Sequence, residues 1–166
     1  LAQHYALNLR DGLIEIDPAG KEIYTRNAEA YIAQLKDLHS WIESQLAELP
    51  KERRKLVTNH ESFGYFADRY GFEVTGTLLP SVTTGASPSA QQLAHLVDQI
   101  RASGSPAIFL EGGANPQLAQ QVAREAGVKV VTGLYTHSLT PPGGAAPTYI
   151  EMMKQNVLMI AAALKP

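Results

Sequence analysis

The chain has 166 residues, of which 45% are hydrophobic and 18% are charged, and its formal net charge is −2. These values are ordinary for a globular protein and exclude a disordered chain, and the length suits one well-buried core with appendages. Because there is no basic excess to neutralise a phosphate backbone, the composition argues against nucleic acid as a partner.

The absence of cysteine limits the chemistry that the chain can carry out. It excludes disulfides, thiolate metal sites and cysteine nucleophiles, so a transition metal would have to be bound by the five histidines together with carboxylates. The longest apolar run, residues 157–164, is far below the roughly 20 residues that a membrane-spanning helix needs. The chain opens at Leu1 within a helical pattern, without an initiator methionine or a signal sequence, and we interpret it as a fragment or a processed chain.

The first part of the chain has helical periodicity. A stripe of apolar residues predicts a helix over residues 1–16, and Asp17 and Pro18 suit the N-cap and first position of a second helix. The near-heptad pattern that follows extends this second helix to about residue 49. Such a long helix either runs along a surface, joins two lobes, or packs within one domain. We therefore divide the chain into a helical segment, residues 1–50, and a lobe, residues 51–166.

After the basic turn at residues 51–55 the period changes, and short apolar runs alternate with helical segments. Strands are predicted over residues 56–58, 72–79, 107–110 and 128–132. Helices are predicted over residues 62–70, 88–103, 117–126 and 148–164, with Ser87 as the N-cap of the second and residues 80–88 as a loop. This alternation predicts an α/β fold, with a four-stranded parallel sheet flanked by helices on both faces.

Metal-binding residue types follow three of the predicted strands. His60 and Glu61 follow the first strand, Glu111 follows the third, and Tyr135 and His137 follow the fourth. The carboxyl ends of parallel strands meet at one edge of a sheet, where ligands bind. Imidazole and carboxylate are the ligands left to a cysteine-free protein for zinc, manganese or iron. Spacing alone does not fix the distances between these side chains.

Each of these residues also has a plain structural alternative. His60 suits a helix cap or a turn hydrogen bond, His137 an exposed loop position, and Glu111 an ion pair or a bond to loop amides. The remaining histidines, His4, His39 and His95, lie within helical stretches and are interpreted as surface or satisfied side chains. The phosphate-binding G-x-G-x-x-G and P-loop patterns and the hydrolase pattern G-x-S-x-G do not occur.

Several motifs taken together resemble one known family. They are VTNHESFGYFADRYG at residues 57–71, SPS at 87–89 with QL at 92–93, IFLE at 108–111 and PTYIEMMKQN at 147–156. The chain is similar to the C-terminal lobe, with connecting helix, of the zinc/manganese/iron solute-binding proteins of ABC transporters. The resemblance covers nearly the whole chain, and the motifs at residues 57–71 and 147–156 are quite specific.

The resemblance implies two α/β lobes joined by one long helix, with a single metal held between them by four side chains. Two ligands would come from an N-terminal lobe that is not part of this chain. His60 matches the third ligand, and the segment YTHSL at residues 135–139 puts His137 at the fourth position, which is usually an aspartate. This departure exchanges an anionic oxygen for a neutral nitrogen, which should favour zinc over manganese. Glu111 matches a carboxylate near the metal.

The sequence therefore predicts an extracytoplasmic zinc or manganese binding protein, without catalysis, that delivers its ion to an ABC transporter permease. His60 and His137 are the predicted metal ligands, and Glu61 and Glu111 are candidates for orienting an imidazole. The full-length protein is expected to be monomeric, periplasmic or extracellular, and anchored to the membrane. Two alternatives stay open at this point: a small metal-dependent hydrolase that uses His60, Glu111 and His137, and a surface adhesion module.

Overall fold

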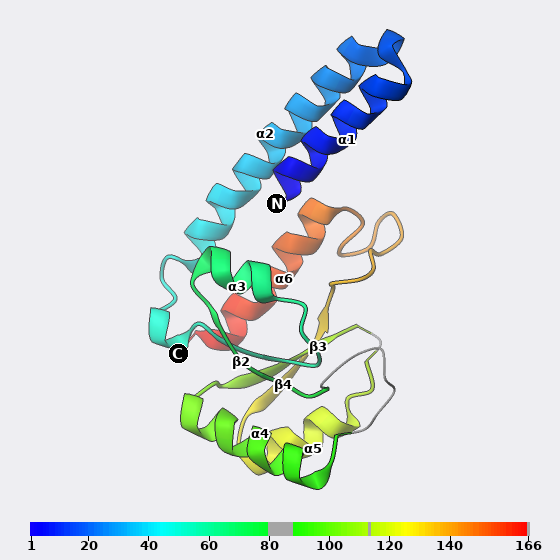
Figure 1. The fold of residues 1–166 in the computed structure, drawn as a ribbon. Coiled ribbons are helices and arrows are strands. Elements are labelled where there is room, and N and C mark those ends of the chain that lie inside the picture. Colours follow the sequence, from blue (N-terminus) through cyan, green and yellow to red (C-terminus); the bar gives the residue numbers. More distant parts are fainter. Residues whose placement is uncertain (80–87, 113, 166) are drawn as a thin grey trace. The chain divides into compact units, whose positions relative to one another are not determined.

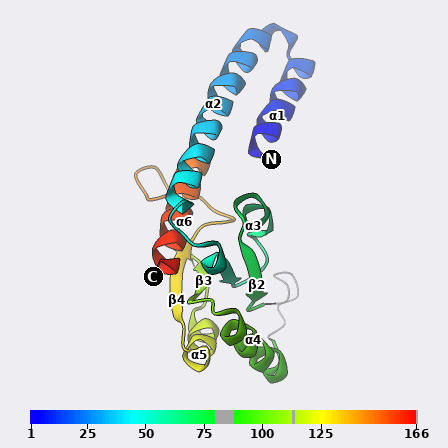
Figure 2. The same cartoon turned by 90° about the vertical axis from the view of Figure 1, so that its left-hand side faces the viewer.

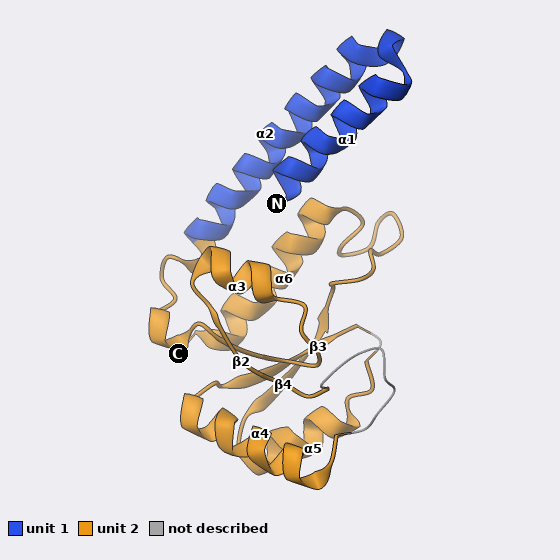
Figure 3. Ribbon diagram, viewed as in Figure 1, with its two compact units in different colours: residues 1–44 blue, residues 45–166 orange. Residues whose placement is uncertain are grey.

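The computed structural model describes residues 1–79, 88–112 and 114–165, so most of the predicted loop at residues 80–88 lies outside the described residues. By compactness the chain divides into two units, residues 1–44 and residues 45–166 (Figure 3). The division falls a few residues before the boundary that the sequence suggested after residue 50, and α2 (Lys21–Leu46) runs across it.

Unit 1 is a pair of antiparallel helices, α1 (Ala2–Ile16) and most of α2 (Figure 1). The expectation of one helix from Pro18 to about Leu49 is wrong at its C-terminal end, because the helix stops at Leu46. At the other end Asp17 and Pro18 take the expected N-cap and first positions, although the first turn, Pro18–Gly20, is a 3-10 turn that runs directly into α2. The Asp17 carboxylate makes no N-cap bond and instead accepts the Tyr24 hydroxyl at 2.6 Å. A Cβ at Gly20 would lie 2.5 Å from the Tyr24 ring, so a larger residue there would require the ring to move.

Unit 2 contains the predicted parallel sheet, with strands in the order β2-β1-β3-β4. The strands are β1 (Lys55–Thr58), β2 (Glu73–Thr77), β3 (Ala107–Glu111) and β4 (Lys129–Leu134). The helices are α3 (Gly64–Tyr70), α4 (Ala90–Ser103), α5 (Gln117–Ala126) and α6 (Tyr149–Leu164), together with a 3-10 turn at Lys51–Arg53. Figures 1 and 2 show α4 and α5 on one face of the sheet and α3 and α6 on the other. The predicted α/β architecture is therefore confirmed.

The core lies on both faces of the sheet because its central strands are apolar throughout. Side chains alternate between faces along a strand, so Val57 and Ile108 face α4 and α5, while Leu56 and Phe109 point to the opposite face. Burying each of these side chains contributes about 1.5–3 kcal/mol. The helical residues of the core include Phe66 of α3, Leu96, Val97 and Ile100 of α4, Val122 of α5, and Val157, Ile160 and Leu164 of α6.

Three boundaries differ from the sequence expectations for identifiable reasons. The helix expected from Ser62 begins at Gly64, and its N-cap position is the buried Phe63, which makes no side-chain capping bond. Ser89, rather than Ser87, caps α4: its hydroxyl accepts from the Gln92 N–H, and the Gln92 side chain accepts from the Ser89 N–H. β4 continues beyond residue 132 to Leu134, whose carbonyl accepts a hydrogen bond from the Gly112 N–H at 2.8 Å.

No helix in the described part of the chain combines the length and the apolar character that crossing a membrane requires.

Candidate metal centre

The register of the sheet brings metal-binding side chains to the same level at its carboxyl edge. Thr58 of β1 lies opposite Phe109 of β3, so His60 and Glu111, each two residues further on, leave neighbouring strands together. Glu111 in turn is paired with Leu134 of β4, after a register shift between Leu110 and Glu111. His137 follows three residues later. The strand ends therefore collect three side chains that lie far apart in the sequence.

His60, Glu111 and His137, which we call the donor triad, each offer one ligand atom, and these atoms all lie within 4.8 Å of one another. His60 Nε2 is 2.7 Å from Glu111 Oε1, and the His60 and His137 rings are stacked with centroids 5.1 Å apart and planes 16° apart. Two nitrogens bound to one tetrahedral zinc ion are roughly 3–3.5 Å apart. The two imidazoles are therefore within side-chain reach of a shared ion.

Burial differs across the donor triad. The side chains of His60 and Glu111 are 6% and 13% exposed, whereas His137 is an exposed residue. A buried carboxylate is stabilised by polar partners, and here Glu111 Oε1 lies 2.7 Å from His60 Nε2 and accepts a hydrogen bond from the Ser62 hydroxyl at 3.3 Å. His60 and Glu111 thus form the buried part of the donor triad, and the exposed His137 leaves room beside it for further metal ligands.

The backbone around His60 is held by its own strand. The Thr58 hydroxyl, 1% exposed, donates to the His60 carbonyl at 2.8 Å. The Leu78 and Leu79 N–H groups donate to the carbonyls of Thr58 and Asn59, so the chain leaving β1 stays tied to the segment after β2. These bonds fix the turn that points His60 toward Glu111.

The segment that carries His137 is anchored at both of its ends. On one side, Asn156 of α6 bonds both backbone groups of Tyr135: its Oδ1 accepts from the Tyr135 N–H at 2.9 Å, and its Nδ2 donates to the Tyr135 carbonyl at 2.6 Å. On the other side, the Thr140 N–H donates to the Ala146 carbonyl, and the Ala146 N–H donates to the Thr140 hydroxyl. Sequence reasoning did not single out Asn156, although a buried polar residue on the inner face of a helix was the available signal.

The other residues considered from the sequence lie outside the donor triad. Glu61 is exposed, and its Oε1 is 3.8 Å from the position of a Cβ on Gly64, at the start of α3. His39 of α2 lies 3.5 Å from Glu43, one helical turn away. His4 and His95 are exposed on α1 and α4. An orienting role for Glu61 stays a prediction.

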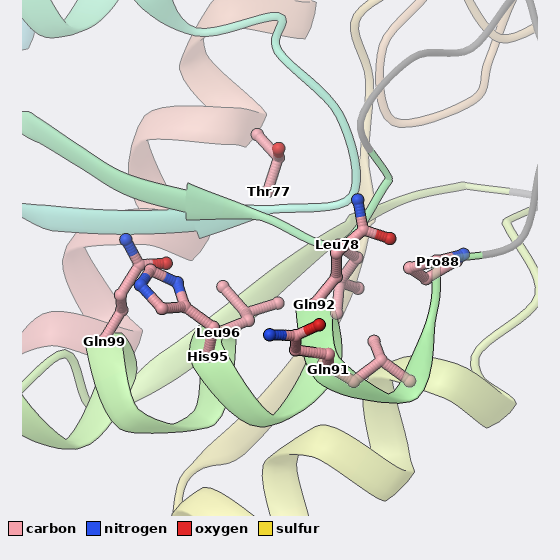
Figure 4. A pocket seen from close by; sticks show the side chains of 9 residues that line it. Thr77, Leu78, Pro88, Gln91, Gln92, His95, Leu96 and Gln99 are labelled. Atoms are coloured by element: carbon pink, nitrogen blue, oxygen red, sulfur yellow. The ribbon is translucent and has the colours of Figure 1, made fainter.

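A separate hollow of about 380 Å³ lies between the end of β2 and α4 (Figure 4). Its polar lining consists of Thr77, His95 and the amides of Gln91, Gln92 and Gln99. The described residues that line this hollow include no carboxylate and no member of the donor triad. Its chemistry therefore differs from that of the triad.

Comparison with known proteins identifies the family. The family model described as zinc-uptake complex component A, periplasmic, matches residues 1–163. The chain belongs to this family. The zinc-uptake component A family thus accounts for both the helical segment and the α/β lobe, and the resemblance noted from the motifs is confirmed.

Members and structural neighbours of the zinc-uptake component A family differ in the metals that their names carry. The manganese-binding lipoprotein MntA of Halalkalibacterium halodurans is 36% identical over 153 residues, which cover 92% of this chain and 50% of that protein. The iron-binding protein YfeA of Yersinia pestis is 36% identical over 157 residues, 95% of this chain and 50% of that protein. A cadmium-bound periplasmic metal-binding protein from Candidatus Liberibacter asiaticus superposes with a TM-score of 0.87 at 28% identity, covering 99% of this chain and 60% of that structure.

The chain thus spans about half the length of the relatives that it matches.

Proposed function

We propose that this chain is the C-terminal lobe, with connecting helix, of an extracytoplasmic metal-binding protein that passes zinc, or manganese, to an ABC transporter permease. The observation that carries the proposal is the donor triad, in which three strand ends each supply one ligand atom within 4.8 Å of the others. Family membership over residues 1–163 supports the same function. The full-length protein would be membrane-anchored and would act without catalysing a reaction.

His60 and His137 are the proposed ligands from this lobe, and Glu111 is proposed to orient His60. A neutral imidazole that donates one N–H to a carboxylate keeps its lone pair on the other ring nitrogen, and the partner carboxylate raises the basicity of that nitrogen. The 2.7 Å contact between His60 Nε2 and Glu111 Oε1 supports this division of roles.

The exposed side of the donor triad suits ligands from a second lobe. A tetrahedral zinc ion with two imidazoles is only half satisfied, so the remaining ligands would come from the other half of the full-length protein. We therefore expect this chain alone to bind zinc weakly and the two-lobed protein to bind it tightly. A neutral nitrogen at His137 favours zinc over manganese, because manganese prefers oxygen ligands.

Calorimetric titration of the chain with zinc tests the proposal. We expect His60→Ala and His137→Ala each to remove the binding, whereas His95→Ala, at an exposed histidine of α4, should leave it unchanged. The same pair of alanine variants should weaken zinc binding by the two-lobed protein. Unchanged zinc affinity in both ligand variants would sink the site assignment.

The metal-dependent hydrolase remains the alternative that the donor triad allows, because three donors with an open side can also hold a metal-bound water. Zinc-dependent turnover of an ester or phosphoester by the chain, lost in Glu111→Gln, would favour this enzyme over the transport protein.

A further inference from the structure

Asn156 is not a proposed metal ligand, but it bonds the backbone of the segment that carries His137. It lies on the inner face of α6, where it is 2% exposed beside the fully buried Val157 and near Ile160. A primary amide in such surroundings is costly unless its polar atoms are paired. Both ends of this amide are paired, and with a single residue, Tyr135.

The two bonds from Asn156 take the place of bonds that a further strand beside β4 would make. β4 is an edge strand of the sheet, and its ladder to β3 ends where the Gly112 N–H donates to the Leu134 carbonyl. Tyr135 is the next residue. By accepting from its N–H and donating to its carbonyl, Asn156 makes the reciprocal pair of bonds that a neighbouring antiparallel strand would make. The backbone is thereby fixed in position and orientation one step beyond the sheet.

His137 comes two residues after this anchor. Its ring is exposed and stacked on that of the buried His60, so little packing surrounds it and its place depends on the backbone that carries it. The Tyr135 bonds fix this backbone on one side and the bonds between Thr140 and Ala146 fix it on the other. We propose that Asn156 is a positioning residue for metal capture, which holds His137 within reach of His60 through the backbone of Tyr135.

The proposal rests on the proposed metal-binding function, and its test separates the two. Asn156→Leu keeps the branched shape in a larger, apolar side chain and removes both bonds, while Asn156→Asp keeps an acceptor for the Tyr135 N–H and loses the donor to the carbonyl. Ser105→Ala is the matched control, because Ser105 is also 2% exposed and bonds backbone carbonyls, of Ala107 and Lys55, at the opposite end of the strands.

The first measurement needs no metal. Stacked imidazoles shift each other's ring-proton resonances, so NMR of the metal-free chain reports the pair of His60 and His137. We expect both Asn156 variants to move these resonances toward unstacked values and Ser105→Ala to leave them in place. Unchanged resonances in Asn156→Asp and in any folded Asn156→Leu protein would overturn the proposal, even if the chain binds no zinc.

The second measurement is zinc titration of the same variants, with urea unfolding of each metal-free protein. Residues that orient metal ligands change affinity by about 10–100-fold when they are removed. We expect zinc affinity to fall by this factor in Asn156→Leu and by a smaller factor in Asn156→Asp. Ser105→Ala should keep the zinc affinity of the wild type, even where its free energy of unfolding falls as much as that of the Asn156 variants. If zinc affinity followed stability alone across the three variants, Asn156 would have no positioning role.

Discussion

His60 Nε2 lies 2.7 Å from Glu111 Oε1, although α3, β2 and α4 separate the two residues along the chain. The contact exists because β1 and β3 are neighbours in the sheet order while β2 lies outside them. It places a carboxylate against an imidazole where both are nearly buried, and Ser62 donates a further hydrogen bond to the same carboxylate oxygen.

Removing the charge of Glu111 should weaken metal binding more than it weakens the fold. Glu111→Gln keeps an oxygen beside His60 and Ser62 but loses the negative charge that lies 2.7 Å from the imidazole. We expect zinc affinity to fall by about tenfold or more. Calorimetry measures the change, with Glu73→Gln, at an exposed position in the first residue of β2, as the control. Equal affinities in wild type and Glu111→Gln would show that this carboxylate does not tune the site.

Exchanging the outer imidazole for a carboxylate should shift metal preference. His137→Asp puts an anionic oxygen at the exposed position of the donor triad, and oxygen donors favour manganese relative to zinc. We expect manganese affinity to rise and zinc affinity to fall. The electron paramagnetic resonance signal of free Mn²⁺ measures the first, and calorimetric titration with zinc measures the second. His95→Asp makes the same charge change on α4 and should alter neither affinity. A matching shift in that control would mean that net charge, rather than the ligand, is responsible.

Arg54 is a half-buried arginine that we expect to be costly to replace. Its guanidinium donates to three backbone carbonyls, those of Leu46, Leu49 and Tyr70, at 2.7, 3.1 and 2.9 Å. A lysine ammonium cannot reproduce this planar fork. We expect Arg54→Lys to lower the free energy of unfolding by about 2–4 kcal/mol, measured by urea unfolding.

Arg124→Lys, on the exposed face of α5, serves as the control for Arg54→Lys and should change stability by less than about 0.5 kcal/mol. A similar small change in Arg54→Lys would mean that water replaces the three carbonyl bonds without loss.

The hydrogen bond from Tyr24 to Asp17 should make the helical segment sensitive to high pH. This bond, then burial and the nearby negative charge, raise the pKa of the Tyr24 phenol above its usual value. A raised pKa means that the folded state holds the proton more tightly. The stabilisation is therefore complete below the unfolded pKa of about 10 and is lost as pH rises through the higher folded pKa.

Ultraviolet titration of tyrosinate measures this effect, because the difference between wild type and Tyr24→Phe isolates one phenol. We expect Asp17→Ala to return the Tyr24 transition toward the usual pKa, and Asp11→Ala, at an exposed aspartate of α1, to leave it in place. A Tyr24 transition that is the same in wild type and Asp17→Ala would contradict the assignment.

The parts of the fold that follow from local pattern could be predicted from the sequence. The wholly apolar run at Ile108 and Phe109 predicts a central strand, and glycines such as Gly71 mark helix ends, where a positive φ of 68° suits a residue without a side chain. Parallel topology places the carboxyl ends of all strands at one edge of the sheet, and this alone predicts His60 and Glu111 as candidate site residues.

The remaining features depend on interactions that sequence spacing does not encode. The 3-10 turn that leads into α2 lies beside the Tyr24 ring and the hydrogen bond from Tyr24 to Asp17, which spacing does not reveal. The place of His137 depends on a segment rich in glycine and proline that has no periodicity and is fixed by Asn156 and Thr140. Since Asn156 acts on a backbone rather than on a ligand, its residue type alone does not reveal its role.

The strand order also determines when the site can exist during folding. Loop-closure entropy must be overcome before β1 and β3 pair, so the contact between His60 and Glu111 is of high contact order and forms late. An ion that needs this pair has nothing to bind in the early collapsed chain. Metal added to a refolding reaction should therefore leave the folding rate unchanged and lower the unfolding rate. The bound ion would then increase the kinetic stability of the folded chain without acting as a folding nucleus.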